Sequence, residues 1–237
     1  MAIIKTKGIV LSTHNMGDND AMCNILTPDL GKIGAAAKGV KRQKSPLMAG
    51  TQFLCYGEFV IYKGVSSYTI NSCEPIEIFY NIRLDVDKLK VASEITKIVS
   101  HVTDENESDY KILQLVLNTM YMISESDKDL DFILSVFKLR LLSIIGYRPV
   151  IESCVNCESF KDVNYFSFMD SGLKCEACAK QDKGAMKLTE ATIKAIKFII
   201  WANPKKIFSF DISEESKREL KVLTKIYLNN CLDYEFD

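Results

Sequence analysis

Two closely spaced cysteine pairs constrain the fold of this chain more than any other feature of its sequence. The pairs are Cys154-Val155-Asn156-Cys157 and Cys175-Glu176-Ala177-Cys178, with residues 158–174 between them. Two residues between paired thiols allow a tight turn to direct both sulfur atoms at one metal ion about 2.3 Å away. The second pair completes a tetrahedron of thiolates and leaves no open coordination position. The sequence therefore predicts one structural Zn²⁺ ion, with the ligands Cys154, Cys157, Cys175 and Cys178.

Three other interpretations of these cysteines stay open. They are two redox-active pairs, four unrelated free thiols, or the ligands of an iron–sulfur cluster. A redox pair is expected between a strand and a helix of a βαβ unit, and ferredoxin-type clusters use more compact spacing, so zinc is favoured. The other four cysteines lie in apolar segments and are predicted to be buried free thiols: Cys23, Cys55, Cys73 and Cys231.

The N-terminal part of the chain predicts a small β-barrel. Short β-rich segments separated by glycine extend from Met1 to about Glu77. Closure of five short strands into a barrel would remove the exposed edges of the sheet. The predicted strands are Ile3–Leu11, Ala21–Leu26, Lys32–Ala37, Phe53–Tyr62 and Tyr68–Ser72.

Helices are predicted for most of the remainder, which makes the fold class α+β. After Pro75 the apolar residues recur with a helical period and predict helices over about 79–102, 110–123 and 130–145. Residues 152–183 show little periodicity, so they predict a loop-rich module stabilised by metal rather than by an apolar core. Thr189 and Ser213 are suitable N-cap residues for two further helices, the first of which ends before Pro204.

One basic segment stands out from an otherwise balanced charge distribution. The formal net charge of −1 gives no general attraction to nucleic acid, but no acidic residue lies between Asp29 and Glu58. The cations of this segment are either phosphate contacts beside an oligonucleotide-binding barrel or part of a solvated loop. Nearby aromatic residues could stack on bases, although their strand spacing favours a place in the core. These cations are Lys32, Lys38, Lys41, Arg42 and Lys44, and the aromatic residues are Phe53, Tyr56 and Tyr62.

No familiar catalytic motif is present, so an enzyme is not expected. The two histidines, His14 and His101, are predicted to be structural or surface groups, and no glycine pattern of nucleotide hydrolases occurs. Asp18 and Asp20 are predicted to shape a turn rather than to hold a metal ion. Lys5 and Lys7 lie where a signal peptide would be apolar, and no apolar run is long enough for a membrane helix, so a cytoplasmic location is expected.

Several short motifs follow one another along the chain. They are Gly8-Ile9-Val10-Leu11, Gly17-Asp18-Asn19-Asp20, residues 27–32, Ala37 to Arg42 with Ser45, Phe137 to Pro149, and the four cysteines. Taken in this order, they resemble the RecO family of bacterial recombination mediators. The resemblance covers nearly the whole chain. It implies an OB-fold β-barrel in residues 1–78, a helical domain in 79–150, an inserted zinc module in 151–183, and C-terminal helices in 184–237 that pack on the helical domain.

The resemblance also implies a function without enzymatic activity. Family members bind single- and double-stranded DNA, anneal complementary strands and, with RecR, load RecA onto strands coated by single-strand-binding protein. The basic motif of the family corresponds to Lys38, Lys41, Arg42 and Lys44, with Lys32 just upstream.

A surface for the tail of single-strand-binding protein belongs to the helical domain of the family. Lys138 and Arg140 are candidates for it, but their apolar helix favours the interpretation that they form its solvent-exposed stripe. Two alternatives to the mediator remain: a zinc-stabilised protein-interaction adaptor that does not bind DNA, and an enzyme that uses the cysteine pairs for redox chemistry.

Overall fold

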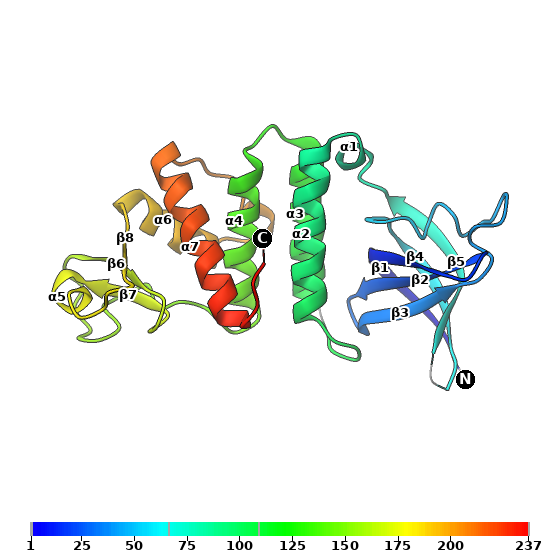
Figure 1. Ribbon diagram of the computed structural model, residues 1–237, viewed down its shortest axis with the longest axis horizontal. Coiled ribbons are helices and arrows are strands. Elements are labelled where there is room, and N and C mark those ends of the chain that lie inside the picture. The colour runs from blue at the N-terminus through cyan, green and yellow to red at the C-terminus, as the bar shows by residue number, and fades with distance from the viewer. Residues whose placement is uncertain (1, 66, 109, 237) are drawn as a thin grey trace. The chain divides into compact units, whose positions relative to one another are not determined.

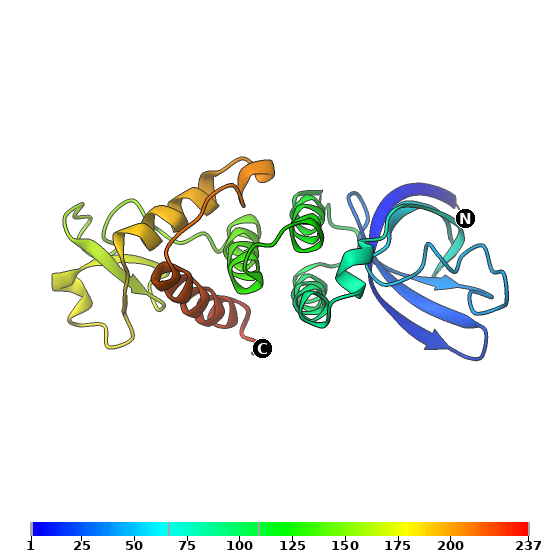
Figure 2. The same ribbon diagram turned by 90° about the horizontal axis from the view of Figure 1, so that it is seen from above.

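The computed structural model describes residues 2–65, 67–108 and 110–236. The chain forms two compact units, Met1–Glu125 and Ser126–Asp237. Figures 1 and 2 show the strands of the barrel within the first unit and a helical group with a small sheet within the second. The fold is therefore α+β, as predicted from the change in periodicity after Pro75.

Five strands close into a barrel in the first unit. In chain order they are β1 (Ala2–Met16), β2 (Asp20–Thr27), β3 (Gly31–Ala37), β4 (Tyr56–Lys63) and β5 (Tyr68–Glu77). Their order around the barrel is β1-β2-β3-β5-β4, and every pair is antiparallel except β3 with β5. Alternate side chains fill the interior, among them Ile25, Ile33, Phe59 and Ile61, none of which is exposed. The predicted OB-like barrel is thus confirmed.

Two strand boundaries differ from those predicted. Strand β1 continues beyond Leu11 to Met16, because its end pairs with β2 across a hairpin in which Gly17 has a φ of 72°. Strand β4 begins at Tyr56 rather than at Phe53, because Leu54 adopts the left-handed conformation with a φ of 64°. A left-handed residue interrupts the extended backbone of a strand.

Helices α1 (Tyr80–Arg83), α2 (Val86–Val102) and α3 (Tyr110–Glu125) complete the first unit. The single helix predicted over 79–102 is divided, because Asp85 has an extended backbone and its carboxylate accepts hydrogen bonds from the amides that open α2. The connection from α2 to α3 joins the barrel, where the Lys32 amide donates to the carbonyl of Asp104 (3.1 Å). Gly31 is required here, since a Cβ atom would lie 2.0 Å from that carbonyl oxygen.

The second unit combines helices with a three-stranded sheet. Helices α4 (Leu130–Ile144), α6 (Glu190–Trp201) and α7 (Glu214–Leu232) pack on one another, with α4 contacting the other two. Thr189 and Ser213 are the N-caps of α6 and α7, as predicted. A 3₁₀ helix, η1 (Pro204–Lys206), follows α6. No helix in the described ranges is both long and apolar enough to span a bilayer.

The segment that holds the cysteine pairs contains more regular structure than predicted. Strands β6 (Val163–Ser167), β7 (Gly172–Cys175) and β8 (Met186–Lys187) form a sheet in the order β7-β6-β8, and the short helix α5 (Glu176–Ala179) follows β7. Phe166 on β6 packs edge-on against Tyr227 of α7 with a centroid distance of 5.2 Å. The module is therefore anchored to the helices by a buried aromatic contact as well as by the chain itself.

The favoured interpretation of the two cations on α4 was wrong. Lys138 is only 4% exposed, so it does not belong to a solvent-facing stripe. The guanidinium of Arg140 reaches the C-terminal end of α6, where it donates to the backbone oxygens of Ile199 (2.9 Å), Ile200 and Ala202 (3.1 Å). Arg140 therefore caps a neighbouring helix, since the last carbonyls of a helix lack partners within it.

Candidate functional site

The basic segment forms the connection between β3 and β4, residues 38–55, which we call the β3–β4 loop. Its beginning is fixed to the hairpin between β1 and β2. The Gly39 amide donates to the Asp20 carboxylate (2.7 Å), and the Lys41 amide donates to the carbonyl of Asn19 (3.0 Å). Asp20 therefore shapes the backbone, which agrees with the predicted turn, and it also holds the loop against the barrel.

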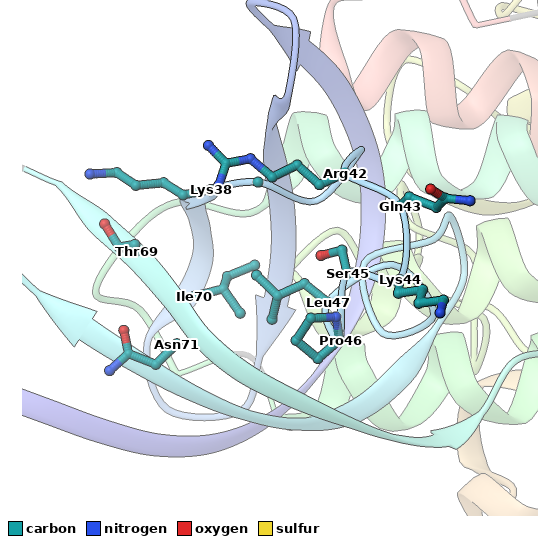
Figure 3. A pocket seen from close by; sticks show the side chains of 11 residues that line it. Lys38, Arg42, Gln43, Lys44, Ser45, Pro46, Leu47, Thr69, Ile70 and Asn71 are labelled. Carbon is teal, nitrogen blue, oxygen red and sulfur yellow. The ribbon is translucent and has the colours of Figure 1, made fainter.

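Three of the predicted DNA contacts line one hollow of about 590 Å³, which we call the first hollow. Lys38, Arg42 and Lys44 come from the β3–β4 loop, and Thr69, Ile70 and Asn71 come from β5 (Figure 3). All three cations are exposed. Within the described residues, no ion pair involves any of them. Their charges are available to an anionic ligand, because no carboxylate of the described chain neutralises them.

Lys41 and Lys32 lie apart from those three residues. Lys41 is exposed, donates to the carbonyl of Gly17 (3.3 Å), and lines a second hollow of about 550 Å³. Lys32 is half-buried on β3, and its ammonium donates to the backbone oxygen of Ser100 in α2. The structure therefore presents four of the five cations on the β3–β4 loop, while the fifth connects the barrel to a helix.

The three aromatic residues near the loop are half-buried rather than part of the barrel interior. Phe53 lines the second hollow. Tyr56 lies near Tyr110 of α3, and burial, followed by the influence of Tyr110, raises the pKa of Tyr56. The aromatic residues of the interior are instead Phe59 and Tyr68. Of the three, Phe53 is thus the aromatic residue that both belongs to the β3–β4 loop and lines a hollow.

The four paired cysteines converge as a metal site requires. Their Sγ atoms all lie within 4.8 Å of one another, and those of Cys157 and Cys175 are 3.7 Å apart. A tetrahedron with metal–sulfur distances of about 2.3 Å has edges of about 3.8 Å, so this spacing fits a metal ion at the centre. The cluster can hold one metal ion with four thiolates.

Backbone amides prepare one of these thiols for metal binding. Burial alone would raise the pKa of Cys154, but hydrogen bonds from the backbone of Cys175, Cys157 and Asn156 lower it to about 6. Hydrogen bonding to Cys175, and then to Cys157, raises the pKa of Cys178 to about 12. Cys154 thus loses its proton more readily than Cys178, and a metal ion would replace the thiol protons of the cluster because thiolates are the ligands.

Gly172 and Lys174 shape the module around the cluster. A Cβ atom on Gly172 would lie 2.5 Å from Cγ1 of Val155, so glycine allows β7 to approach the first cysteine pair closely. The buried ammonium of Lys174 binds the carboxylates of Asp170 (2.5 Å) and Asp182 (2.9 Å). Lys174 directly precedes Cys175, and its ammonium pairs with these two carboxylates.

The remaining cysteines follow their prediction in part. Cys23 and Cys55 are buried within the barrel, as predicted, whereas Cys73 and Cys231 are partly exposed. Burial raises the pKa values of Cys23 and Cys231. Cys73 also packs against the β3–β4 loop, where its thiol donates to the carbonyl of Gly50 (3.4 Å).

Some residues of the site carried no sequence signal. Arg83 from α1 and Leu89 from α2 line the second hollow together with Met48 of the loop. They come from segments that the sequence assigns to a different domain, so only the folded chain brings them beside the basic residues. The hydrogen bond between the Gly39 amide and the Asp20 carboxylate was also missed, because the two residues are 19 positions apart and meet only when the barrel folds.

The closed barrel, its basic loop and the four-cysteine cluster define an α+β protein built on a barrel of the oligonucleotide-binding type. The family described as "Recombination protein O N terminal" matches residues 1–79, and the family described as "Recombination protein O C terminal" matches residues 83–234. The chain belongs to the RecO family.

Full-length relatives carry the name DNA repair protein RecO. The protein of Acetivibrio thermocellus is 43% identical over 100% of this chain and 94% of its own length. That of Alkaliphilus metalliredigens is 34% identical over 98% of this chain and 94% of its length. That of Thermoanaerobacter sp. is 30% identical over 100% of this chain and 95% of its length. The similarity therefore extends over both units.

Proposed function

We propose that this chain is a DNA-binding recombination mediator in DNA repair. It binds single- and double-stranded DNA, anneals complementary strands and helps to load RecA together with RecR, without catalysing a reaction. The observation that carries the proposal is the group of exposed cations on the β3–β4 loop, which no carboxylate of the described residues neutralises. Membership of the RecO family supports the repair role.

The chemistry of the loop suits contacts to the DNA backbone. Lys38, Lys41, Arg42 and Lys44 are long, exposed cations that can each bind a phosphate. Neutralising phosphates releases condensed counterions, which favours binding to any sequence and makes the affinity depend on salt. Annealing requires two strands that repel each other to approach while their base edges stay free, and phosphate contacts meet both needs.

The partners and the location follow from the family resemblance. We propose RecR and single-strand-binding protein as partners, and the cytoplasm as the place of action. Lys138 and Arg140 are not proposed as the contact for the tail of single-strand-binding protein, because one is buried and the other is bonded to the end of α6. The tail of single-strand-binding protein is therefore not proposed to bind the two cations of α4.

The metal of the cysteine cluster is proposed to be zinc. Four thiolates in a tetrahedron suit Zn²⁺, and a site closed by four protein ligands holds structure rather than activating a substrate. A metal ion held by Cys154, Cys157, Cys175 and Cys178 would connect the segment before β6 to the end of β7 and to α5. This connection stiffens a module that has a small apolar core.

A charge-matched pair of variants tests the proposed DNA contacts. Replacement of Lys38, Arg42 and Lys44 together by alanine should weaken the binding of a labelled single-stranded oligonucleotide by about 100-fold at about 0.1 M salt. This estimate follows because each lost contact removes about 0.7 from the slope of log affinity against log salt. Fluorescence anisotropy of the oligonucleotide provides the measurement.

The control variant loses three exposed lysines of the second unit. Lys197, Lys205 and Lys225 have the same charge and no ion pair within the described residues. Their replacement by alanine should change the affinity by less than about threefold, because these lysines do not belong to the β3–β4 loop that is proposed to contact the phosphates, and exposed charges outside the contact are screened at this salt concentration. Equal affinities for both variants and the unchanged protein would refute the loop as a DNA contact and favour the protein-interaction adaptor.

A further inference from the structure

The second hollow is distinct in chemistry from the first. Its walls are mostly apolar and include Val40, Met48, Phe53 and Leu89, and a single exposed lysine, Lys41, lines it from the loop. Met48 is 44% exposed although its side chain is apolar. The lining also contains Arg83 and the polar residues Thr13, Asn15, Thr51 and Gln52. Its volume of about 550 Å³ falls within the range of about 300–1,000 Å³ that is typical of small-molecule sites.

The walls of this hollow are held in place by hydrogen bonds. The Thr13 hydroxyl donates to the carbonyl of Thr51 (3.0 Å), which fixes the loop to β1. The Arg83 guanidinium donates to the carbonyl of Phe53 (2.6 Å) and to the side chain of Gln52. The hollow therefore exists before any ligand arrives, and a ligand does not need to order the loop.

The position of the hollow indicates what it binds. Lys41 and Arg42 are consecutive residues of the β3–β4 loop, yet Lys41 lines the second hollow and Arg42 lines the first. A DNA strand whose phosphates contact both cations would carry one base beside the second hollow. Phe53 and Met48 offer that base an aromatic ring and a polarisable thioether, and the polar lining residues can bond to its edge.

We propose that the second hollow receives one unpaired nucleobase of a single strand whose phosphates lie on the β3–β4 loop. This inference rests on the proposed function, because it requires DNA on that loop. A paired base is stacked within a duplex and cannot enter, so the hollow gives the protein a preference for single strands. During annealing, the base leaves the hollow when it pairs with the complementary strand.

The test compares two ligands that differ only in their bases. A short labelled thymidine oligonucleotide and the same oligonucleotide built from abasic nucleotides carry equal phosphate charge. The unchanged protein should bind the thymidine strand about 5- to 150-fold more tightly, which is the range for stacking of one base on an aromatic side chain. Phe53→Leu keeps an apolar side chain but removes the ring, so the two affinities should become nearly equal.

A matched control and a charge variant separate this inference from the proposed function. Phe160→Leu removes an aromatic ring that is 82% exposed in the second unit, and it should keep the preference for thymidine. Replacement of Lys38, Arg42 and Lys44 by alanine should lower the affinity for the thymidine strand and for the abasic strand by the same factor. Equal binding of both strands by the unchanged protein, or a preference that persists in Phe53→Leu, would overturn the nucleobase site while leaving the phosphate contacts intact. Failure to bind either strand would refute the proposed function itself.

Discussion

The direction of individual side chains decides which cations can meet DNA. Five cations share one basic segment in the sequence, but the sequence does not specify which groups each side chain contacts in the folded protein. Lys32 belongs to β3, and its ammonium donates a hydrogen bond to the carbonyl of Ser100 in helix α2. Ser100 is distant in the chain, so no local pattern could separate Lys32 from Lys38, Lys41, Arg42 and Lys44.

A comparison of two single variants tests this distinction. Arg42→Ala should weaken binding to single-stranded DNA by about fivefold at about 0.1 M salt, because one phosphate contact is lost. Lys32→Ala should change that affinity by less than about twofold, but should lower the free energy of unfolding by about 1 kcal/mol through the lost hydrogen bond. Anisotropy and urea denaturation measure the two effects. A loss of affinity in Lys32→Ala as large as that in Arg42→Ala would show that Lys32 also binds DNA.

At the scale of elements, local chemistry predicted much of the fold. The caps Thr189 and Ser213 lie next to the helices they begin, so their prediction needed only neighbouring residues. The cysteine spacing predicted a cluster for a similar reason, since each pair is local. The sheet β7-β6-β8 was missed because its strands are short and their pairing depends on the folded module.

Helix α4 illustrates how a correct prediction can lead to a wrong one. The helix predicted over residues 130–145 is present, its sequence is apolar nearly all round, and ten of its residues are buried. Such a helix has little surface left for a solvent-facing stripe, so its cations had to find partners inside the unit. Lys138 is buried and Arg140 bonds to the end of α6.

Removal of the Arg140 guanidinium should destabilise the second unit. Arg140→Met keeps the apolar stem but leaves the carbonyls of Ile199, Ile200 and Ala202 without this donor. The free energy of unfolding should fall by about 3 kcal/mol, the size expected for hydrogen bonds to a charged group that is partly buried. Chemical denaturation measures the change, and Arg140→Lys should recover only part of it because ammonium lacks the fork geometry. An unchanged stability of Arg140→Met would contradict the capping role.

Metal removal should affect one module and spare the barrel. The purified protein should contain about one Zn²⁺ per chain, and a chelator should release it because four thiolates are its ligands. Hydrogen exchange should then accelerate in residues 152–183, with little change in β1 to β5. The serine variant of Cys175 should behave like the chelated protein. Metal-free protein with full protection of this segment would rule out a metal that holds the module together.

At the scale of the whole molecule, the order of strands and helices in the sequence predicted the fold class, whereas the composition did not predict the binding surface. The change from strands to helices predicted an α+β fold, and the resemblance covered both units. The net charge of −1 says nothing about the local concentration of cations on the β3–β4 loop. The boundary between the two compact units, after Glu125, falls within the predicted helical range 79–150. The division of the chain into four parts stays a prediction.

The most direct measurement of the central claim is the affinity for single-stranded DNA across a series of salt concentrations. Fluorescence anisotropy of a labelled oligonucleotide should give a straight line of log affinity against log salt with a slope of about −3. This slope follows from four loop cations at about 0.7 each. Absence of binding at low salt, or an affinity that does not change with salt, would contradict a mediator that holds DNA by its phosphates.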